Sequence, residues 1–344
     1  MIRLNCDYLE GCHPAILQKL METNMEQTVG YGEDPYCAKA AELIRQTFAC
    51  PDSAVHFLVG GTQTNATVID ATLRPYEGVL SADTGHINVH ETGAIEATGH
   101  KVLALPGTNG KITAAQVREA VALQANDEHV VKPGMVYISL STELGTLYTL
   151  RELKELYAAC QELHLPLFID GARLGYALAS SASDIKPADL AHLCDVFYIG
   201  GTKVGALFGE ALVISNPAIN RDFRYMIKRH GGMLAKGRLL GVQFKALFED
   251  GLYFRLGEHA VAMADKIRAT LNEMGVSYLI PGTTNQIFPI FSDAFLAELV
   301  KEFMFTEQER VSPTHRAIRF CTSWATTEEN TDALCAKLKS LAGL

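Results

Sequence analysis

The sequence lacks the features that mark several large classes of protein. No apolar run approaches the roughly 20 residues that cross a membrane, and residues 1–7 show no signal-peptide pattern. Positive charge is in deficit, because 30 Lys and Arg stand against 39 Asp and Glu, which leaves a formal net charge of −9. We therefore expect neither a membrane partner nor a nucleic-acid partner.

Paired cysteine motifs are also missing. The eight cysteines are scattered along 344 residues and include no C-x-x-C pair. In a chain of this length, such spacing favours reduced thiols over a disulfide framework and predicts a cytoplasmic enzyme. The length itself is enough for one large domain with a sizeable core and a smaller second domain.

One lysine lies in a stretch that is otherwise mostly apolar residues and glycine. Val196–Ile199 is rich in β-branched and aromatic residues and predicts a buried strand, which stops at Gly200 and Gly201. Lys203 follows, and 206–214 predicts a second strand. Desolvation lowers the pKa of a lysine, so that its neutral amine can attack a carbonyl. From this stretch alone, a lysine in a surface loop is the open alternative.

A strand-to-helix junction upstream offers a place for a phosphate. A predicted strand over 55–59 leads into Gly60, Gly61 and Thr62 and then into a predicted helix over 66–73. Free backbone N–H groups at such a helix start can bind an anion. The pattern matches neither a dinucleotide loop nor a nucleoside-triphosphate loop.

Asp170 ends another predicted apolar strand, over 165–169, and a predicted helical crossover over 174–194 leads on toward Lys203. Because the carboxyl ends of parallel strands meet at one edge of an open sheet, we expect Asp170 and Lys203 at the same edge. Strands alternate with helices from 54 to 214, which predicts an α/β fold with a mostly parallel sheet.

Capping residues and periodicity predict further elements. Pro14 begins a helix with an apolar stripe, Asp34 caps the helix that begins at Pro35, and Thr149 opens a capping box with Glu152. The stripe comprises Ile16, Leu17, Leu20 and Met21. The other predicted elements are strands over 79–82, 101–105, 135–140, 276–280, 286–290 and 317–321, helices over 114–123, 252–274 and 327–341, and a loop over 124–133.

Two histidines raise the question of a metal. His86 and His90 could share one helix face, with Glu91 beside them. The H-E-x-x-H order is absent and no third ligand is evident nearby, so we predict no metal site. A metal hydrolase that uses these three residues is the rival interpretation.

An aspartate, a lysine, a phosphate-binding turn and a histidine at one sheet edge are the parts needed to hold pyridoxal 5'-phosphate. Four segments resemble, in order and spacing, the L-threonine aldolase / β-eliminating lyase family of fold-type I pyridoxal-phosphate enzymes. They are Gly60–Thr62, Gly85–His86 with Glu91–Ala94, Phe168–Arg173 and Gly201–Lys203. The resemblance covers essentially the whole chain.

This resemblance implies an aspartate-aminotransferase-like fold with a large cofactor domain and a small C-terminal α/β domain, which we place at 1–235 and 236–344. It implies that Lys203 is the Schiff-base lysine, that Asp170 pairs with the ring nitrogen and that His86 stacks on the ring. Gly61 and Thr62 would bind the phosphate. His86 or an ordered water is the candidate base.

By the same resemblance, Arg173 lies near the ring hydroxyl and the substrate carboxylate, and Arg319 grips that carboxylate. Bidentate hydrogen bonding suits an arginine to this task. Tyr31 and Cys6 match positions near the substrate.

Lys228 and Arg229 resemble a segment that reaches into a neighbouring subunit's site. We therefore expect a homodimer or a dimer of dimers, that is, a homotetramer.

Three positions depart from the family pattern. Cys6 precedes Asp7 where the family usually has Ser or Asn. Thr202-Lys203-Val204 replaces the common Ser-Lys-Gly, and Thr142–Thr146 replaces a Glu-Asn-Thr block. These departures bear on the recognition of the carboxylate and hydroxyl groups more than on the cofactor.

The activity implied is that of a low-specificity L-threonine aldolase, which cleaves L-threonine and L-allo-threonine to glycine and acetaldehyde. Alternatives within the fold are a β-eliminating lyase and an aldolase for another β-hydroxy amino acid such as phenylserine. A non-catalytic binding protein that keeps the fold is the alternative from another class.

Overall fold

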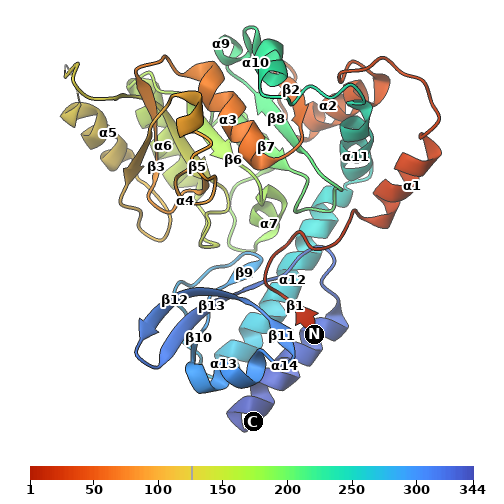
Figure 1. Ribbon diagram of the computed structural model, residues 1–344, viewed down its shortest axis with the longest axis vertical. Helices are drawn as coiled ribbons and strands as arrows, with labels where there is room; N and C mark the ends of the chain where they lie inside the picture. The colour runs from red at the N-terminus through yellow and green to blue at the C-terminus, as the bar shows by residue number, and fades with distance from the viewer. Residues whose placement is uncertain (125–126) are drawn as a thin grey trace.

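A large sheet forms the upper part of the molecule in the computed structural model, which describes residues 1–124 and 127–344 (Figure 1). Its strands are β2 (Ala54–Leu58), β3 (Glu77–Ala82), β4 (Val102–Leu105), β5 (Lys132–Ser139), β6 (Leu167–Asp170), β7 (Val196–Gly200) and β8 (Glu210–Ile214). They lie in the order β2-β8-β7-β6-β5-β3-β4. The neighbouring strands from β7 through β6, β5 and β3 to β4 pair in parallel. Strand β8 is antiparallel to both of its neighbours, β2 and β7. The predicted α/β class with a mostly parallel sheet is confirmed.

The central strands are buried on both faces. Ile169 and Phe197 point into one core, and Phe168 and Tyr198, one position along each strand, point into the other. A strand with helices on both of its faces needs apolar side chains at every position, which is why these segments read as continuous apolar runs.

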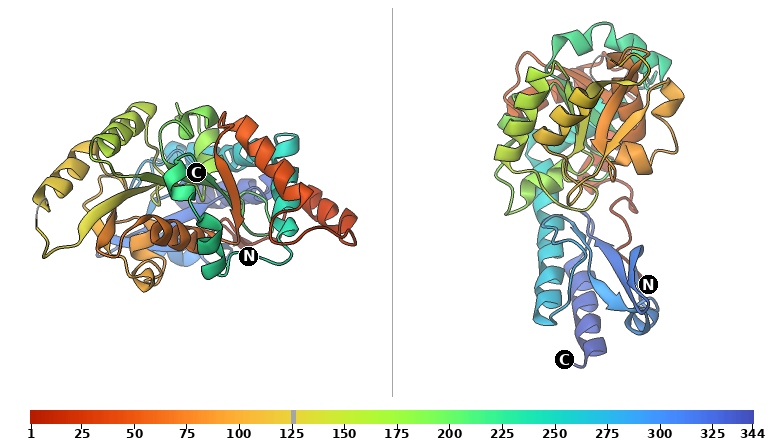
Figure 2. Two further views of the ribbon diagram at one scale, coloured as in Figure 1. Left: turned by 90° about the horizontal axis from the view of Figure 1, so that it is seen from above. Right: turned by 90° about the vertical axis from the view of Figure 1, so that its left-hand side faces the viewer.

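Helices cover both faces of this sheet (Figures 1 and 2). One face packs against α2 (Pro35–Thr47), α5 (Ala114–Leu123), α6 (Leu150–Glu162), α7 (Leu174–Ala179), α8 (Pro187–Leu190) and α11 (Arg238–Glu249). The other packs against α3 (Gly61–Thr72), α4 (His86–Val89), α9 (Pro217–Asn220) and α10 (Phe223–Arg229). The 3₁₀ turn η1 (Glu96–Thr98) follows the buried Ile95 on this side. Helix α1 (Pro14–Glu22) lies at the margin of the large part.

A long helix, α12 (Leu252–Glu273), runs from the large part into a smaller one (Figure 1). There β9 (Gln286–Ile287), β10 (Ile290–Ser292), β12 (Thr306–Ser312) and β13 (His315–Cys321) pair antiparallel beside α13 (Asp293–Leu299) and α14 (Glu328–Ala342). The N-terminal strand β1 (Ile2–Arg3) pairs with β11 (Phe303–Met304). The N-terminal arm therefore joins the C-terminal part of the chain. The division at residue 235 stays a prediction, and α11, which follows it, packs on α2.

The predicted caps are present. Asp34 Oδ1 accepts the backbone N–H of Cys37 at 2.9 Å and begins α2. Thr149 and Glu152 form the reciprocal hydrogen bonds of a capping box at α6. Such caps satisfy N–H groups that have no partner inside the helix, so they locate a helix start from local sequence alone.

Several predicted boundaries were wrong. Helix α3 begins at Gly61 instead of 66, and the predicted strand over 206–214 begins only at Glu210 because Gly205 and Gly209 turn the chain with φ of 92° and 112°. The segment 276–280 makes only an isolated bridge at Tyr278, and so is not a strand.

Other differences concern the connections. The crossover over 174–194 contains two short helices, α7 and α8, and the predicted strand over 286–290 divides into β9 and β10. Strand β12 was missed because its side chains are polar and mostly exposed. In the predicted loop over 124–133, positions 125–126 lie outside the described residues, and β5 already begins at Lys132. Within the described ranges, the helices are too short or too polar to span a membrane.

Candidate active site

The carboxyl ends of the parallel strands border a cavity of about 110 Å³. The structure brings together here the predicted site residues Gly61, Thr62, His86, Asp170, Arg173 and Lys203. Ser139, Ser141, Glu143, Ala172 and Tyr198 complete the lining. The sheet edge expected from the strand ends is therefore where these groups meet.

Asp170 is a buried carboxylate surrounded by donors. Tyr137 and Tyr198 each donate a hydroxyl to it at 2.5 Å, and the Ala172 backbone N–H and the Asn65 amide donate at 2.9 and 3.2 Å. Burial alone would raise the pKa of Asp170, but the charge of His86 and these hydrogen bonds hold it below its ordinary value. Asp170 is therefore ionised at neutral pH, as a partner of a protonated ring nitrogen must be.

His86 is oriented by a second buried carboxylate. Its Nδ1 lies 2.8 Å from Glu91 Oε1, which also accepts the Asn65 amide at 2.7 Å. Burial disfavours the imidazolium, but Glu91 and Asp170 together raise the pKa of His86 above its ordinary value. Asn65 thus links the carboxylates of Asp170 and Glu91.

The start of α3 faces the same cavity. Gly60 is its N-cap, and no described side chain caps the first turn, so backbone N–H groups are available there. A Cβ at Gly61 would lie 3.0 Å from the Tyr198 hydroxyl, so a larger residue here would force that hydroxyl to shift. This arrangement suits a phosphate.

The two predicted carboxylate ligands differ in how fully they are paired. Arg173 donates twice to Asp7, from Nε at 2.7 Å and from Nη2 at 3.0 Å. Arg319, on β13, donates to the backbone oxygen of Asn5 and to the Gln286 side chain. Its buried Nε has no hydrogen-bond partner in the described part of the chain. Arg319 therefore retains a donor for an anionic ligand, whereas Arg173 is held by Asp7.

The pairing of Asp7 also links the N-terminal arm to the site. Burial would raise the pKa of Asp7, but the charges of Arg173 and Lys203 hold it below its ordinary value. Cys6, the neighbouring predicted residue, is half-buried and lies beside the Asn5 amide.

A model of the β-eliminating lyase family matches residues 4–294. The chain belongs to this family. A low-specificity L-threonine aldolase of Pseudomonas sp. (strain NCIMB 10558) is 32% identical, and the match covers 97% of this chain and 96% of that protein. The corresponding protein of Pseudomonas aeruginosa is 33% identical over 85% of each chain.

Solved structures of other proteins are also similar to this chain. A Leishmania major threonine aldolase superposes with a TM-score of 0.98 at 45% identity, covering 99% of this chain and 100% of that one. Thermus thermophilus aspartate aminotransferase with maleate has a TM-score of 0.72 at 14% identity, covering 99% and 91%, which shows a shared fold. The predicted resemblance and the aspartate-aminotransferase-like fold are confirmed.

As a β-eliminating lyase family member, the protein is a pyridoxal-phosphate-dependent lyase, and its cavity fits that cofactor. Lys203 would attach it, Asp170 would face its ring nitrogen, and Gly61 and Thr62 would hold its phosphate. The ionised Asp170 supplies the matching acceptor, and the uncapped turn of α3 supplies the matching donors. Among the described residues, no three His, Cys, Asp or Glu side chains gather as metal ligands would.

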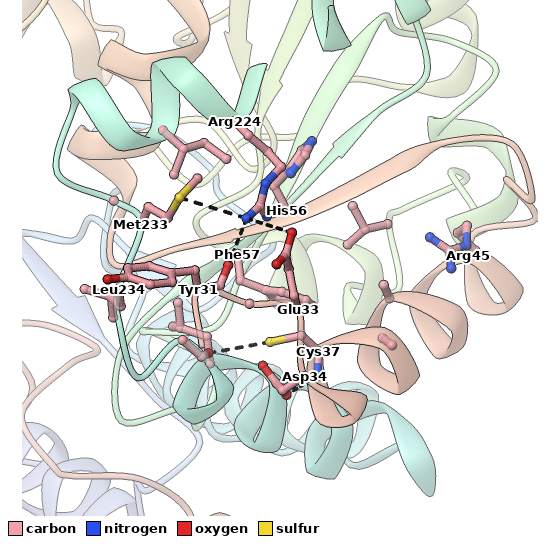
Figure 3. Close-up of a pocket in the computed structure, with 18 residues that line it drawn as sticks. Tyr31, Glu33, Asp34, Cys37, Arg45, His56, Phe57, Arg224, Met233 and Leu234 are labelled. Carbon is pink, nitrogen blue, oxygen red and sulfur yellow. Dashed lines mark hydrogen bonds and ion pairs between the residues drawn. The ribbon is translucent and has the colours of Figure 1, made fainter. Parts of the chain in front are cut away.

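Five of the predicted residues do not line this cavity in their own chain, namely Cys6, Tyr31, Lys228, Arg229 and Arg319. Tyr31 lines a different cavity of about 270 Å³ together with Glu33, Arg224 and Met233 (Figure 3). Lys228 Nζ lies 5.1 Å from the centre of the Tyr31 ring. Arg229 pairs with Asp70 at 2.6 Å. A contribution of Tyr31, Lys228 and Arg229 to catalysis would therefore require a second subunit.

Glu143 lines the Lys203 cavity and was not predicted as a site residue. Its Oε1 accepts the Ser139 hydroxyl at 2.6 Å and the His86 backbone N–H at 3.0 Å. Burial raises the pKa of Glu143, and the charge of Asp170 adds to this effect. Its place in the block that departs from the family's Glu-Asn-Thr pattern was the only signal in the sequence.

Proposed function

We propose that the protein is a low-specificity L-threonine aldolase, which cleaves L-threonine and L-allo-threonine to glycine and acetaldehyde. The observation that carries the proposal is the convergence of Lys203, the ionised Asp170 and the Glu91-oriented His86 on one cavity. The aldolase names of the relatives that match nearly the whole chain support it.

The residues divide the work by their chemistry. Pyridoxal phosphate, when bound, supplies an electron sink for the electron pair released as the Cα–Cβ bond breaks. Lys203 Nζ would bind the cofactor, and the Asp170 carboxylate would keep a proton on the ring nitrogen. His86 Nε2 is the ring nitrogen that Glu91 does not engage, and it would accept the proton of the β-hydroxyl group. Glu91 stabilises the imidazolium that results.

Arg319 supports an amino-acid substrate. The Nε of Arg319, which has no partner among residues 1–124 and 127–344, offers a charge-assisted hydrogen bond to a carboxylate. We expect Arg319→Lys to lower kcat/KM for threonine by about 10- to 100-fold, since a hydrogen bond to a charged group contributes roughly 1.5–3 kcal/mol. Steady-state kinetics would measure this loss. Unchanged kinetics would place the carboxylate elsewhere.

One assay tests the activity directly. Acetaldehyde release from each threonine isomer is coupled to an NADH-dependent alcohol dehydrogenase, and glycine is measured in parallel. Pyruvate from serine or cysteine without acetaldehyde would instead show an eliminating lyase. Cleavage of phenylserine alone would show an aldolase for another β-hydroxy amino acid.

We also propose a homodimer or a dimer of dimers in the cytoplasm. Of the predicted stripe on α1, only Ile16 is buried, and Leu17 and Met21 are 52% and 66% exposed. Met25 is also exposed, so this apolar surface is available to a second copy of the chain. The eight cysteines are all unpaired, which favours a reducing compartment.

Two experiments test the assembly. Light scattering at the assay concentration should show an oligomer, and an active monomer would refute the proposal. If Lys228 serves the neighbouring site, co-expressed Lys203→Ala and Lys228→Ala chains should form mixed oligomers that recover part of the activity that each lacks alone.

A further inference from the structure

A buried carboxylate lies behind the turn that carries Lys203. Glu210 is the first residue of β8 and is 4% exposed. It is in register with Gly200 of β7 on one side and with Leu58 of β2 on the other. A carboxylate in this position is costly unless its oxygens receive hydrogen bonds.

Both of its oxygens accept hydrogen bonds from the residues just before Lys203. Oε2 accepts the backbone N–H of Gly201 at 3.0 Å, and Oε1 accepts the Thr202 hydroxyl at 2.9 Å. The Thr202 hydroxyl oxygen in turn accepts the N–H of Gly209 at 3.0 Å. Glu210 therefore joins the two ends of the turn from 201 to 209.

The groups that face Glu210 leave Lys203 as its principal cation. Burial raises the pKa of Glu210 to about 7, Lys203 acts against this effect, and Asp170 adds to it. Tyr198 on β7 and Tyr253 on α12 also face it, and burial raises the pKa of each tyrosine, so both are neutral at physiological pH. Above pH 7, Glu210 is therefore ionised and supplies a negative charge behind the turn that carries Lys203.

A purely structural role of this residue would not need a charged side chain. A neutral amide could close the same turn, because the two contacts require only polar atoms near the Gly201 N–H and the Thr202 hydroxyl. A carboxylate also places a negative charge behind the turn that carries Lys203, and such a charge favours a cation in front of it.

We propose that Glu210 is a positioning residue, which fixes the turn that presents Lys203 to the cofactor and places a negative charge behind that turn. This inference rests on the proposed attachment of the cofactor to Lys203 and is independent of the substrate.

The test is a pH titration of the visible absorption of the cofactor-loaded enzyme without substrate. In Glu210→Gln the titration midpoint should fall by about one pH unit relative to wild type, because the nearby negative charge is lost. Glu77→Gln is the matched control, since Glu77 is the first residue of β3 and so lies at the end of that strand away from the cavity. The midpoint of this variant should equal that of wild type. An unchanged midpoint in Glu210→Gln would overturn the inference.

A second variant separates charge from geometry and serves if Glu210→Gln does not fold. Glu210→Asp keeps the charge but is one methylene shorter, so it cannot reach both donors. Its midpoint should stay nearer to wild type than to Glu210→Gln, while cofactor release on dialysis should become several-fold faster. Wild-type values for both quantities would refute the proposal. A wild-type enzyme without visible absorption would instead refute the attachment of the cofactor to Lys203.

Discussion

Asp170 and Glu210 are both fully buried carboxylates at the same edge of the large sheet, and their environments differ. Asp170 accepts hydrogen bonds from two tyrosine hydroxyls, an amide and a backbone N–H, and its pKa is lowered despite a burial effect that would raise it. Glu210 accepts from one backbone N–H and one hydroxyl, and burial raises its pKa to about 7.

The difference shows that burial alone does not decide the charge of a carboxylate. The number of donors and the position of nearby charges decide it. Asp170 has enough donors to stay charged next to a cofactor ring, whereas Glu210 changes charge near neutral pH. Asp170 is therefore a permanent anion of the cavity, whereas Glu210, which lies behind it, is a pH-dependent one.

The largest effect is expected from removing Lys203, the principal cation near Glu210. Lys203→Ala should abolish the visible absorption of the bound cofactor and lower turnover by roughly 10³-fold or more, because covalent attachment is lost. Borohydride reduction followed by mass spectrometry checks this. A cofactor adduct on the protein that persists in Lys203→Ala would identify another lysine as the attachment site.

The permanent anion is tested next. Asp170→Asn should lower turnover by roughly 10²- to 10³-fold, because an oriented charge at the reacting centre is lost. Cofactor binding should weaken much less, since the other contacts persist. Turnover and the cofactor dissociation constant are measured on the same preparation. Wild-type turnover would place Asp170 outside the reaction.

The comparison also predicts opposite effects of pH on stability. The raised pKa of Glu210 means that the folded protein holds its proton from the ordinary value of 4.5 up to about 7, so stability falls as pH rises through that window. This loss is about 3 kcal/mol for a fully buried group. The lowered pKa of Asp170 instead gives stability that is present above 3.8 and is lost as pH falls further.

Melting temperatures from pH 5 to pH 8 measure the Glu210 effect. Glu210→Gln should show a smaller decline than wild type between pH 5 and 7, because Glu143 and His86, whose pKa values are also raised, still contribute to it. Glu77→Gln should keep the wild-type decline. Parallel profiles for wild type and Glu210→Gln would mean that Glu210 does not titrate in this window.

The smallest effect is expected from removing one of the hydrogen-bond donors of Asp170. Tyr198→Phe removes one hydroxyl from Asp170 and should raise its pKa. Turnover should fall by about 10-fold, in line with the roughly 1.5–3 kcal/mol of a hydrogen bond to a charged group. The acid limb of the pH–rate profile should move to higher pH. An unmoved acid limb would show that the remaining donors are sufficient.

Much of this arrangement could be predicted because its signals are local. Continuous apolar runs that end at Asp170 and just before Lys203 located two strand ends, and the capping residues Asp34 and Thr149 located two helix starts. The motifs around Gly61 and His86 then placed the chain in its family. Hydrophobic periodicity and capping depend on neighbours in sequence, so the sequence contains them.

The errors arose where local composition misled. The apolar letters of 206–214 suggested a single strand and hid Glu210, because a turn with Gly209 at positive φ separates Ala206 from β8. Strand β12 has polar, exposed side chains, so no apolar alternation marked it. Glu143 was overlooked because only the fold directs it into the cavity.

Local sequence patterns were sufficient to predict the fold class, the strand ends that carry Asp170 and Lys203, and the cofactor that these residues imply. The pairing of charges depends instead on how the chain folds. Arg173 is held by Asp7, 166 positions away, because β1 pairs with β11 and carries the N-terminal arm into the site. Arg319 Nε, by contrast, has no hydrogen-bond partner among the residues that the structure describes. Such pairings depend on how distant segments pack, and no local pattern encodes that packing.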